Sequence, residues 1–168
     1  AKSLPGIPPA NIIGEPVGRD TANAIALAAE MLSVRDPDAT MAVFTADHVI
    51  RPIDIFCQNV QGALDAAEAN PDALLTFGVH PTWPHTGLGY IHCAEATKDG
   101  IHKVLGFKEK PKHQEARQYV ESGQYYWNSG MFVWKLPAIR NSLRKFLPAS
   151  MDRLAPVTQA VRDGQDPT

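Results

Sequence analysis

Residues 84–93 read PHTGLGYIHC, residues 103–107 read KVLGF, and the turn Lys98-Asp99-Gly100 lies between them. Residues 90–93 and 103–107 have the composition of strands, so the turn predicts an antiparallel pair. Upstream, apolar runs at 41–45 and 73–79 predict two further strands. Helical spacing is found at 22–32 and from Asp54 onward. Strands that alternate with helices, followed by a strand pair, predict an α/β fold with a mixed, mostly parallel sheet and flanking helices.

The outer parts of the chain extend this pattern. Asp20 or Thr21 is expected to cap the first helix. We also expect a helix over 113–121, a strand over 131–134, and a helix over 137–147 with proline in its first turn. Residues 11–13 form a strand-like run, whereas the polar tail over 155–168 predicts no regular element.

Composition excludes several classes of protein. The chain has 168 residues, of which 44% are hydrophobic, with a formal net charge of -2. This balance argues against a nucleic-acid-binding or membrane-binding face. No apolar run is long enough to predict a membrane span. Cys57 and Cys93 lack metal-site spacing, so we expect both to be buried, reduced thiols of a cytoplasmic protein.

Polar groups beside small residues recur in three blocks, 84–93, 106–111 and 127–132. Glu109 and Lys110 place an acceptor next to a cation, and an acceptor and a cation together suit a sugar hydroxyl and a phosphate. Asn128 places an amide beside Ser129 and Gly130, and an amide both donates to and accepts from hydroxyls. The blocks favour a sugar-phosphate pocket. The alternatives are a solvated strand end at Glu109 and a plain turn at Asn128.

Two further segments follow predicted strands. Asp47 comes directly after the run 41–46, where ligand sites of open α/β sheets gather, and one carboxylate with phosphate oxygens and water suits Mg²⁺. Its alternative is a loop cap. The turn from Glu15 through Arg19 to Asp20 leads into a helix N-terminus, which offers free N–H groups to a base or phosphate. Its alternative is a simple turn with Asp20 as the cap.

The order of these blocks is similar to that of a known family. EPVGRDTA at 15–22, ADH at 46–48, FGVHPT at 77–82, TGLGYI at 86–91, EKP at 109–111 and WNSGMF at 127–132 together resemble mannose-1-phosphate guanylyltransferases. These enzymes are the GDP-mannose pyrophosphorylase branch of the sugar nucleotidyltransferases. The resemblance runs from about residue 13 to residue 147. It implies a Rossmann-like nucleotide-diphospho-sugar transferase fold.

The resemblance also implies an activity. It implies that GTP and mannose 1-phosphate give GDP-mannose and pyrophosphate, with Mg²⁺ as cofactor. By motif match, Asp47 resembles the magnesium carboxylate, and both Asp47 and Lys110 are expected to be catalytic. Substrate-binding roles are implied for Gly89, Tyr90, Glu109 and Asn128. Nucleotide-binding roles are implied for Glu15, Arg19 and Asp20.

Departures from the family pattern shape the remaining expectations. The family's first strand, its glycine-rich triphosphate loop and its second magnesium carboxylate have no counterpart in these 168 residues. We therefore expect residues 1–168 to be a single, partial nucleotidyltransferase domain that lacks the first strands of the fold and is inactive alone. A homodimer is an expected assembly. The open alternatives are a nucleotidyltransferase for another hexose 1-phosphate or base, and a non-catalytic relative that binds sugar nucleotides.

Overall fold

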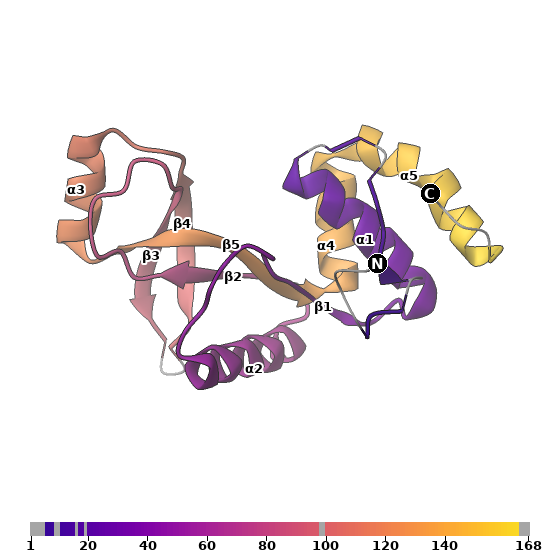
Figure 1. Cartoon of the computed structure of the whole chain (residues 1–168), viewed down its shortest axis with the longest axis horizontal. Helices are drawn as coiled ribbons and strands as arrows, with labels where there is room; N and C mark the ends of the chain where they lie inside the picture. Colours follow the sequence, from indigo (N-terminus) through magenta and orange to yellow (C-terminus); the bar gives the residue numbers. More distant parts are fainter. Residues whose placement is uncertain (1–5, 9–10, 16, 19, 98–99, 165–168) are drawn as a thin grey trace. The chain divides into compact units, whose positions relative to one another are not determined.

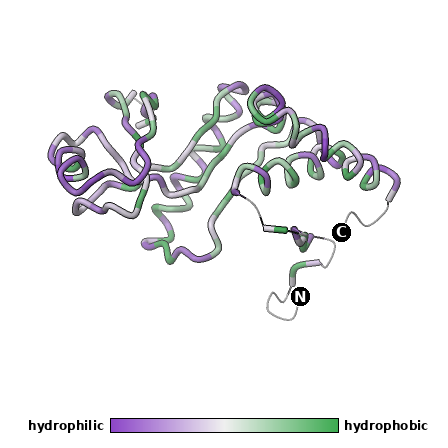
Figure 2. The backbone as a smooth tube through the Cα atoms, turned by 90° about the horizontal axis from the view of Figure 1, so that it is seen from above, coloured by the Kyte–Doolittle hydropathy of each residue, from purple (hydrophilic) through white to green (hydrophobic). Residues whose placement is uncertain are grey.

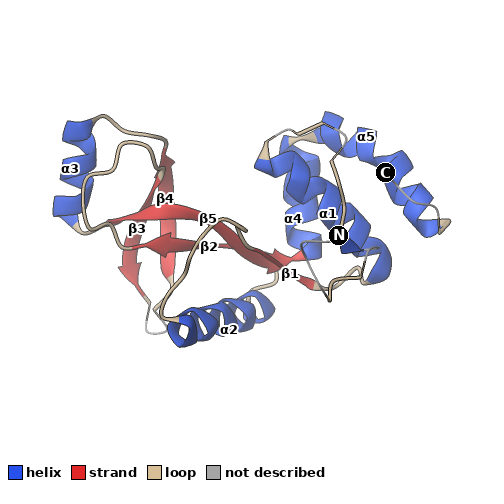
Figure 3. Cartoon of the chain, in the orientation of Figure 1, coloured by secondary structure: helices blue, strands red, loops and turns tan. Residues whose placement is uncertain are grey.

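The chain is a mixed α/β structure. The computed structural model describes residues 6–8, 11–15, 17–18, 20–97 and 100–164. The five strands of its sheet are β1 (Thr40–Val43), β2 (Leu74–Val79), β3 (Tyr90–Ala96), β4 (His102–Lys108) and β5 (Tyr125–Lys135). The helices are α1 (Thr21–Arg35), α2 (Ile53–Ala69), α3 (His113–Ser122), α4 (Leu136–Phe146) and α5 (Pro148–Arg162) (Figures 1 and 3).

The sheet order is β1-β5-β3-β4, and β2 also pairs with β5. The predicted antiparallel pair is confirmed, because β3 pairs antiparallel with β4 in a register that sets Tyr90 opposite Lys108. Lys98 and Asp99 of the connecting turn lie outside the described residues. The mostly parallel sheet is not confirmed, since β3 also pairs antiparallel with β5. An apolar run fits the middle of either kind of sheet, so composition alone could not decide the direction of β5.

The described chain divides into two compact units. One unit comprises residues 1–41, 68–73 and 134–168, and the other comprises residues 42–67 and 74–133. The single partial domain over residues 1–168 stays a prediction. We describe each unit by itself.

The first unit is a group of helices in which α1, α4 and α5 pack against one another (Figure 1). Asp20 caps α1 as predicted, because its carboxylate accepts the backbone N–H of Asn23 at 3.0 Å. Ala26 and Ala29 are fully buried, and such small residues let neighbouring helices approach closely. Leu136, Ile139 and Met151 are also buried in this core.

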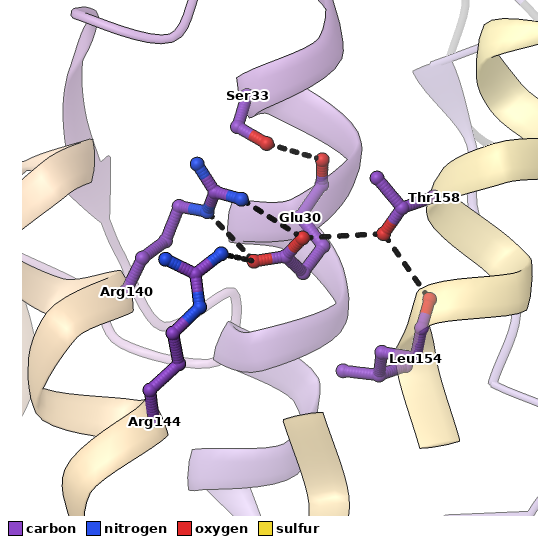
Figure 4. A network of polar contacts seen from close by, with 6 residues as sticks. All are labelled: Glu30, Ser33, Arg140, Arg144, Leu154 and Thr158. Atoms are coloured by element: carbon purple, nitrogen blue, oxygen red, sulfur yellow. Dashed lines mark hydrogen bonds and ion pairs between the residues drawn. The ribbon is translucent and has the colours of Figure 1, made fainter. Parts of the chain in front are cut away.

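The carboxylate of Glu30 is buried among these helices. Glu30 accepts from Arg140 Nε at 2.6 Å and from Arg140 Nη2 at 3.1 Å (Figure 4). Thr158 of α5 donates to the same carboxylate at 3.2 Å, and Arg144 lies 3.8 Å away. Burial by itself raises the pKa of Glu30, but the hydrogen bonds and positive charge of Arg140 outweigh it, so the pKa lies below its usual range. Glu30 is therefore ionised in the folded protein and joins three helices.

The second unit holds most of the sheet, with α2 and α3. Phe44, just after β1, packs edge-on against Phe56 of α2 with ring centroids 5.7 Å apart. Tyr119 of α3 stacks on Tyr125 of β5 at 4.1 Å and meets Tyr90 of β3 edge-on at 5.4 Å. Figure 2 shows α3 as largely hydrophilic, in keeping with a surface helix that touches the sheet through few side chains.

Three expectations from the sequence are wrong. Residues 11–13 form no strand, and Arg35 donates to Asn11 at 3.0 Å instead. Residues 155–162 of the polar tail belong to α5, which begins at Pro148, a favoured residue for a first helical turn. Cys57 is exposed on α2, whereas Cys93 is buried as expected, and both thiols are free. Among the described residues, no helix is both long and apolar enough to span a membrane.

Candidate functional site

A pocket of about 730 Å³ opens in the second unit, where several strands end. Its lining comes from the segment after β1, the end of β2, the loop before β3, the segment after β4, and the middle of β5. Five residues to which the resemblance assigns catalytic or substrate-binding roles line this pocket: Asp47, Gly89, Glu109, Lys110 and Asn128. The roles assigned to them stay predictions.

Glu109 and Lys110 follow the end of β4. Two successive strand residues point to opposite faces, but the backbone bends here, with a positive φ of 40° at Lys110. The bend lets both side chains reach the pocket, with Lys110 Nζ 3.3 Å from Glu109 Oε1. Both side chains are exposed, so the pair keeps its charges available to a ligand.

Gly89 lies between Glu109 and Asn128. A β carbon added at Gly89 would lie 3.1 Å from Glu109 Oε2 and 3.8 Å from Asn128 Cβ. The Gly89 carbonyl accepts the backbone N–H of Asn128 at 2.8 Å. Gly89 thus keeps a space open between the Glu109 carboxylate and the Asn128 side chain, and a larger residue would fill it.

The segment from Asn128 to Gly130 bends within β5. Gly130 has a φ of 72°, a conformation that glycine adopts readily, and its N–H donates to Asn128 Oδ1 at 3.2 Å. Ser129 Oγ donates to the carbonyl of Phe77 on β2 at 2.7 Å and accepts the N–H of Met131 at 3.2 Å. With Asn128 Oδ1 engaged by Gly130, the Asn128 amide N–H groups are the part left for a ligand.

Asp47 lies just after β1, and its side chain is 87% exposed. His48 Nε2 lies 3.9 Å from Asp47 Oδ1, beyond hydrogen-bonding distance. The described residues contain no cluster of three or more His, Cys, Asp or Glu side chains that could hold a metal by themselves. A single exposed carboxylate in a pocket fits Mg²⁺, which takes one or two carboxylates and leaves its other positions to phosphate and water.

Tyr90 does not line the pocket. Its ring is fully buried, and its hydroxyl donates to the carbonyl of His85 at 2.9 Å. The resemblance implied a substrate-binding role for Tyr90 by motif match, but successive residues of an extended chain face opposite sides, so Tyr90 and its neighbour Gly89 need not face the same way. In the structure, Tyr90 supports the loop before β3 from the core.

Two of the nucleotide-binding residues expected near the N-terminus, Glu15 and Asp20, belong to the first unit. Asp20 caps α1, and Glu15 is exposed. Arg19 lies outside the described residues. Nothing in their geometry tests the predicted contact with a nucleotide.

Sequence reasoning missed one charged contributor to the pocket. Arg51 lines it and has no hydrogen bond or ion pair among the described residues. Its position four residues after Asp47, in the same segment, was the available signal. Trp127 also lines the pocket, and its indole N–H is buried without a partner in the described part of the chain.

Comparison with known proteins yields a family match. A sequence profile of the family described as "Nucleotidyl transferase" matches residues 8–165. Mannose-1-phosphate guanylyltransferase of Salmonella typhimurium is 45% identical over 163 residues, which cover 94% of this chain and 33% of the relative. The same enzyme of Klebsiella pneumoniae is 40% identical over 159 residues, covering 93% and 33%.

A solved structure has a similar fold. The crystal structure described as mannose-1-phosphate geranyltransferase from Thermus thermophilus superposes with a TM-score of 0.78 at 27% identity. The match covers 92% of this chain and 44% of that one. The chain thus spans about a third of the length of the curated relatives it matches.

Proposed function

The chain belongs to the nucleotidyl transferase family, and from that membership we propose that it forms part of a mannose-1-phosphate guanylyltransferase. The proposed reaction joins GTP and mannose 1-phosphate. A phosphate oxygen of the sugar phosphate attacks the α-phosphorus of GTP, the bond to the β-phosphate breaks, and pyrophosphate leaves with that electron pair. GDP-mannose is the other product. The observation that carries the proposal is the placement of Gly89, Glu109, Lys110 and Asn128 around one pocket.

The pocket suits a hexose phosphate. The space that Gly89 leaves free adjoins the Glu109 carboxylate, which accepts, and the β carbon of Asn128, whose amide N–H groups can donate. Adjacent sugar hydroxyls both donate and accept, so they match this pair. Lys110 supplies a charge for the sugar phosphate, next to Glu109. In this proposal the protein contributes mainly position and charge, as phosphoryl transfer requires.

Asp47 is the residue that would hold Mg²⁺. When bound, the ion supplies a positive charge that neutralises phosphate oxygens.

Glu15, Arg19 and Asp20 belong to the proposal as nucleotide contacts, with support from the motif alone. A cytoplasmic location is part of the proposal too, since free thiols at Cys57 and Cys93 suit a reducing compartment. The last part of the proposal is that the protein forms a homodimer, and a light-scattering measurement of its mass in solution tests this.

The test of the reaction uses the complete protein that carries this chain. Each of GTP, ATP, UTP, CTP and dTTP is paired with mannose 1-phosphate or glucose 1-phosphate, and sugar nucleotide and pyrophosphate are measured. We expect GTP with mannose 1-phosphate to give the highest kcat/KM. Preference for another base or hexose would replace the proposed substrates, and binding without turnover in every pair would identify a non-catalytic relative.

The test of the pocket uses Glu109→Gln. Hydrogen bonds to a charged group contribute about 1.5–3 kcal/mol, so the dissociation constant for mannose 1-phosphate should rise about 10-fold to 150-fold. Glu121→Gln is the matched control, because Glu121 pairs with Arg117 on exposed α3 and does not line the pocket. Equal affinity of the two variants would remove Glu109 from the binding site.

A further inference from the structure

The loop between β2 and β3 contains a histidine whose ring and backbone are both fixed. His85 lies against Trp83, with ring centroids 4.4 Å apart, and meets Trp127 of β5 edge-on at 6.2 Å. Its carbonyl accepts the Tyr90 hydroxyl at 2.9 Å, and Tyr90 is fully buried. The backbone of His85 is therefore tied to the core of the second unit, and its ring packs against two indoles that also contact each other, with centroids 6.4 Å apart.

The His85 ring in turn holds the next residues of the loop. The backbone N–H of Gly87 donates to His85 Nδ1 at 2.9 Å. A β carbon added at Gly87 would lie 2.9 Å from His85 Cε1, so ring and backbone are in close contact. A backbone N–H can only donate, and Nδ1 is therefore the acceptor. The ring in this arrangement is neutral and carries its proton on Nε2.

Gly87 begins the part of this loop that lines the pocket. Gly87, Leu88 and Gly89 all line it, and the Gly89 carbonyl accepts the N–H of Asn128 at 2.8 Å. A continuous set of contacts thus runs from the buried Tyr90 through His85 and Gly87 to the backbone beside Asn128. The shape of the pocket wall depends on the ring of His85.

We propose that His85 is a positioning residue for the sugar phosphate, and that only its neutral ring holds the Gly87–Gly89 wall in the binding shape. The inference rests on the proposed function for the identity of the ligand. Protonation places a hydrogen on Nδ1, so that two donors face each other and the contact with Gly87 is lost. Affinity for mannose 1-phosphate should then be lower at a pH at which the ring is protonated.

The described groups that contact His85 are uncharged. The rings that face it from the loop and from β5 are the neutral indoles of Trp83 and Trp127, and Tyr90 faces its carbonyl from β3. None of the ion pairs among the described residues includes His85. The charged or titratable side chains of the pocket that Gly87 enters are Asp47, His48, Arg51, Glu109 and Lys110.

The decisive variant is His85→Asn. The Asn side-chain oxygen can accept an N–H two residues ahead in an Asx turn, so it takes the place of Nδ1 without titrating. His85→Ala removes the acceptor. His113→Asn is the control, because His113 is an exposed histidine at the start of α3 that does not line the pocket.

The first measurement needs no ligand. In the complete protein, the NMR amide resonance of Gly87 is followed between pH 8 and pH 5. We expect it to titrate in the wild type and in His113→Asn, and to stay constant in His85→Asn. A Gly87 amide that titrates equally in His85→Asn, or in no form of the protein, overturns the proposal whatever the enzyme binds.

The second measurement is calorimetric titration with mannose 1-phosphate. One hydrogen bond of this kind changes affinity about 3-fold to 10-fold, which is the loss expected for His85→Ala at pH 8 and for the wild type at pH 5. His85→Asn should bind as the wild type does at pH 8 and keep more of that affinity at pH 5, since titration of the sugar phosphate itself is common to all variants. Parallel pH profiles for wild type and His85→Asn would overturn the proposal. A titrating Gly87 amide without binding of mannose 1-phosphate would instead reject the proposed substrate.

Discussion

Gly78 lies so close to Tyr126 that a β carbon at residue 78 would be 2.7 Å from Tyr126 Cβ. Both atoms belong to paired strands, β2 and β5, and neither is the flexible end of a side chain. One residue before Gly78, the Phe77 carbonyl accepts the Ser129 hydroxyl. The missing side chain at Gly78 therefore permits the approach of strands that sets Ser129 and its neighbour Asn128 at the pocket.

Gly78→Ala should consequently damage both stability and binding. Overpacking of this kind costs about 1–3 kcal/mol in the free energy of unfolding. Any movement of β5 away from β2 also displaces Asn128, so affinity for mannose 1-phosphate should fall. Chemical denaturation and calorimetric titration measure the two effects. Gly62→Ala is the control, since nothing lies within 4 Å of its added β carbon and alanine in a helix interior should stabilise α2 by about 1 kcal/mol.

Asp47→Asn should reduce turnover while leaving the sugar phosphate bound. A neutral amide is a poor ligand for Mg²⁺, whereas Glu109 and Asn128 are untouched. We expect kcat of the complete protein to fall about 100-fold or more, with a small change in the dissociation constant for mannose 1-phosphate. Asp54→Asn serves as the control, because Asp54 is in the first turn of α2 and does not line the pocket. Near-normal kcat at saturating magnesium would refute a metal role.

Glu30→Gln should destabilise the first unit. Removing the charge leaves Arg140, whose side chain is 17% exposed, without its carboxylate, and breaking such a buried pair costs about 3 kcal/mol. Denaturation curves of wild type and variant give this difference. Glu121→Gln, at an exposed pair, should leave the midpoint unchanged.

The same carboxylate predicts a pH dependence of stability. The pKa of Glu30 is lowered in the folded protein, so folding stabilises the ionised form. This contribution is fully present above the unfolded pKa of about 4.3 and is lost as the pH falls through the lower folded value. The free energy of unfolding measured from pH 6 to pH 3 should therefore decline more steeply in the wild type than in Glu30→Gln. Equal slopes would contradict the assignment.

The two thiols should react at different rates. Cys57 is exposed on α2, whereas Cys93 is buried and its pKa is raised by burial, which lowers its thiolate content. A disulfide reagent at pH 8 should modify Cys57 rapidly and Cys93 only after denaturant is added. Cys57→Ser should remove the fast phase and keep the slow one. A fast phase that survives in Cys57→Ser would mean that β3 opens readily.

Local sequence patterns predicted much of the fold and several residues of the pocket. The cap at Asp20, the strand pair β3 and β4, and the helices α1 to α4 follow from turn residues and apolar spacing near each element. The pocket residues were found because Gly89, Glu109 and Asn128 each lie in a distinct motif. The direction of β5 and the existence of α5 depend on packing partners far along the chain, which a local pattern does not contain.

The side-chain orientations at the pocket were harder to predict. The positive φ at Lys110 brings Glu109 and Lys110 to the same pocket, although strand alternation separates them. Tyr90 is adjacent to Gly89 in sequence, yet it faces the core. Arg51 carries no motif of its own and lines the pocket only because the segment after Asp47 turns toward it.

The position of Glu30 also determines the order in which the chain can fold as it leaves the ribosome. Its partners Arg140 and Thr158 lie 110 and 128 residues downstream, so the helical unit cannot close until Thr158 has been synthesised. The sheet-containing unit ends at Val133 and can close earlier. During that interval α4 and α5 do not yet cover the alanine face of α1, around Ala26 and Ala29. Nascent-chain proteolysis should accordingly find α1 cleavable after the sheet has become resistant.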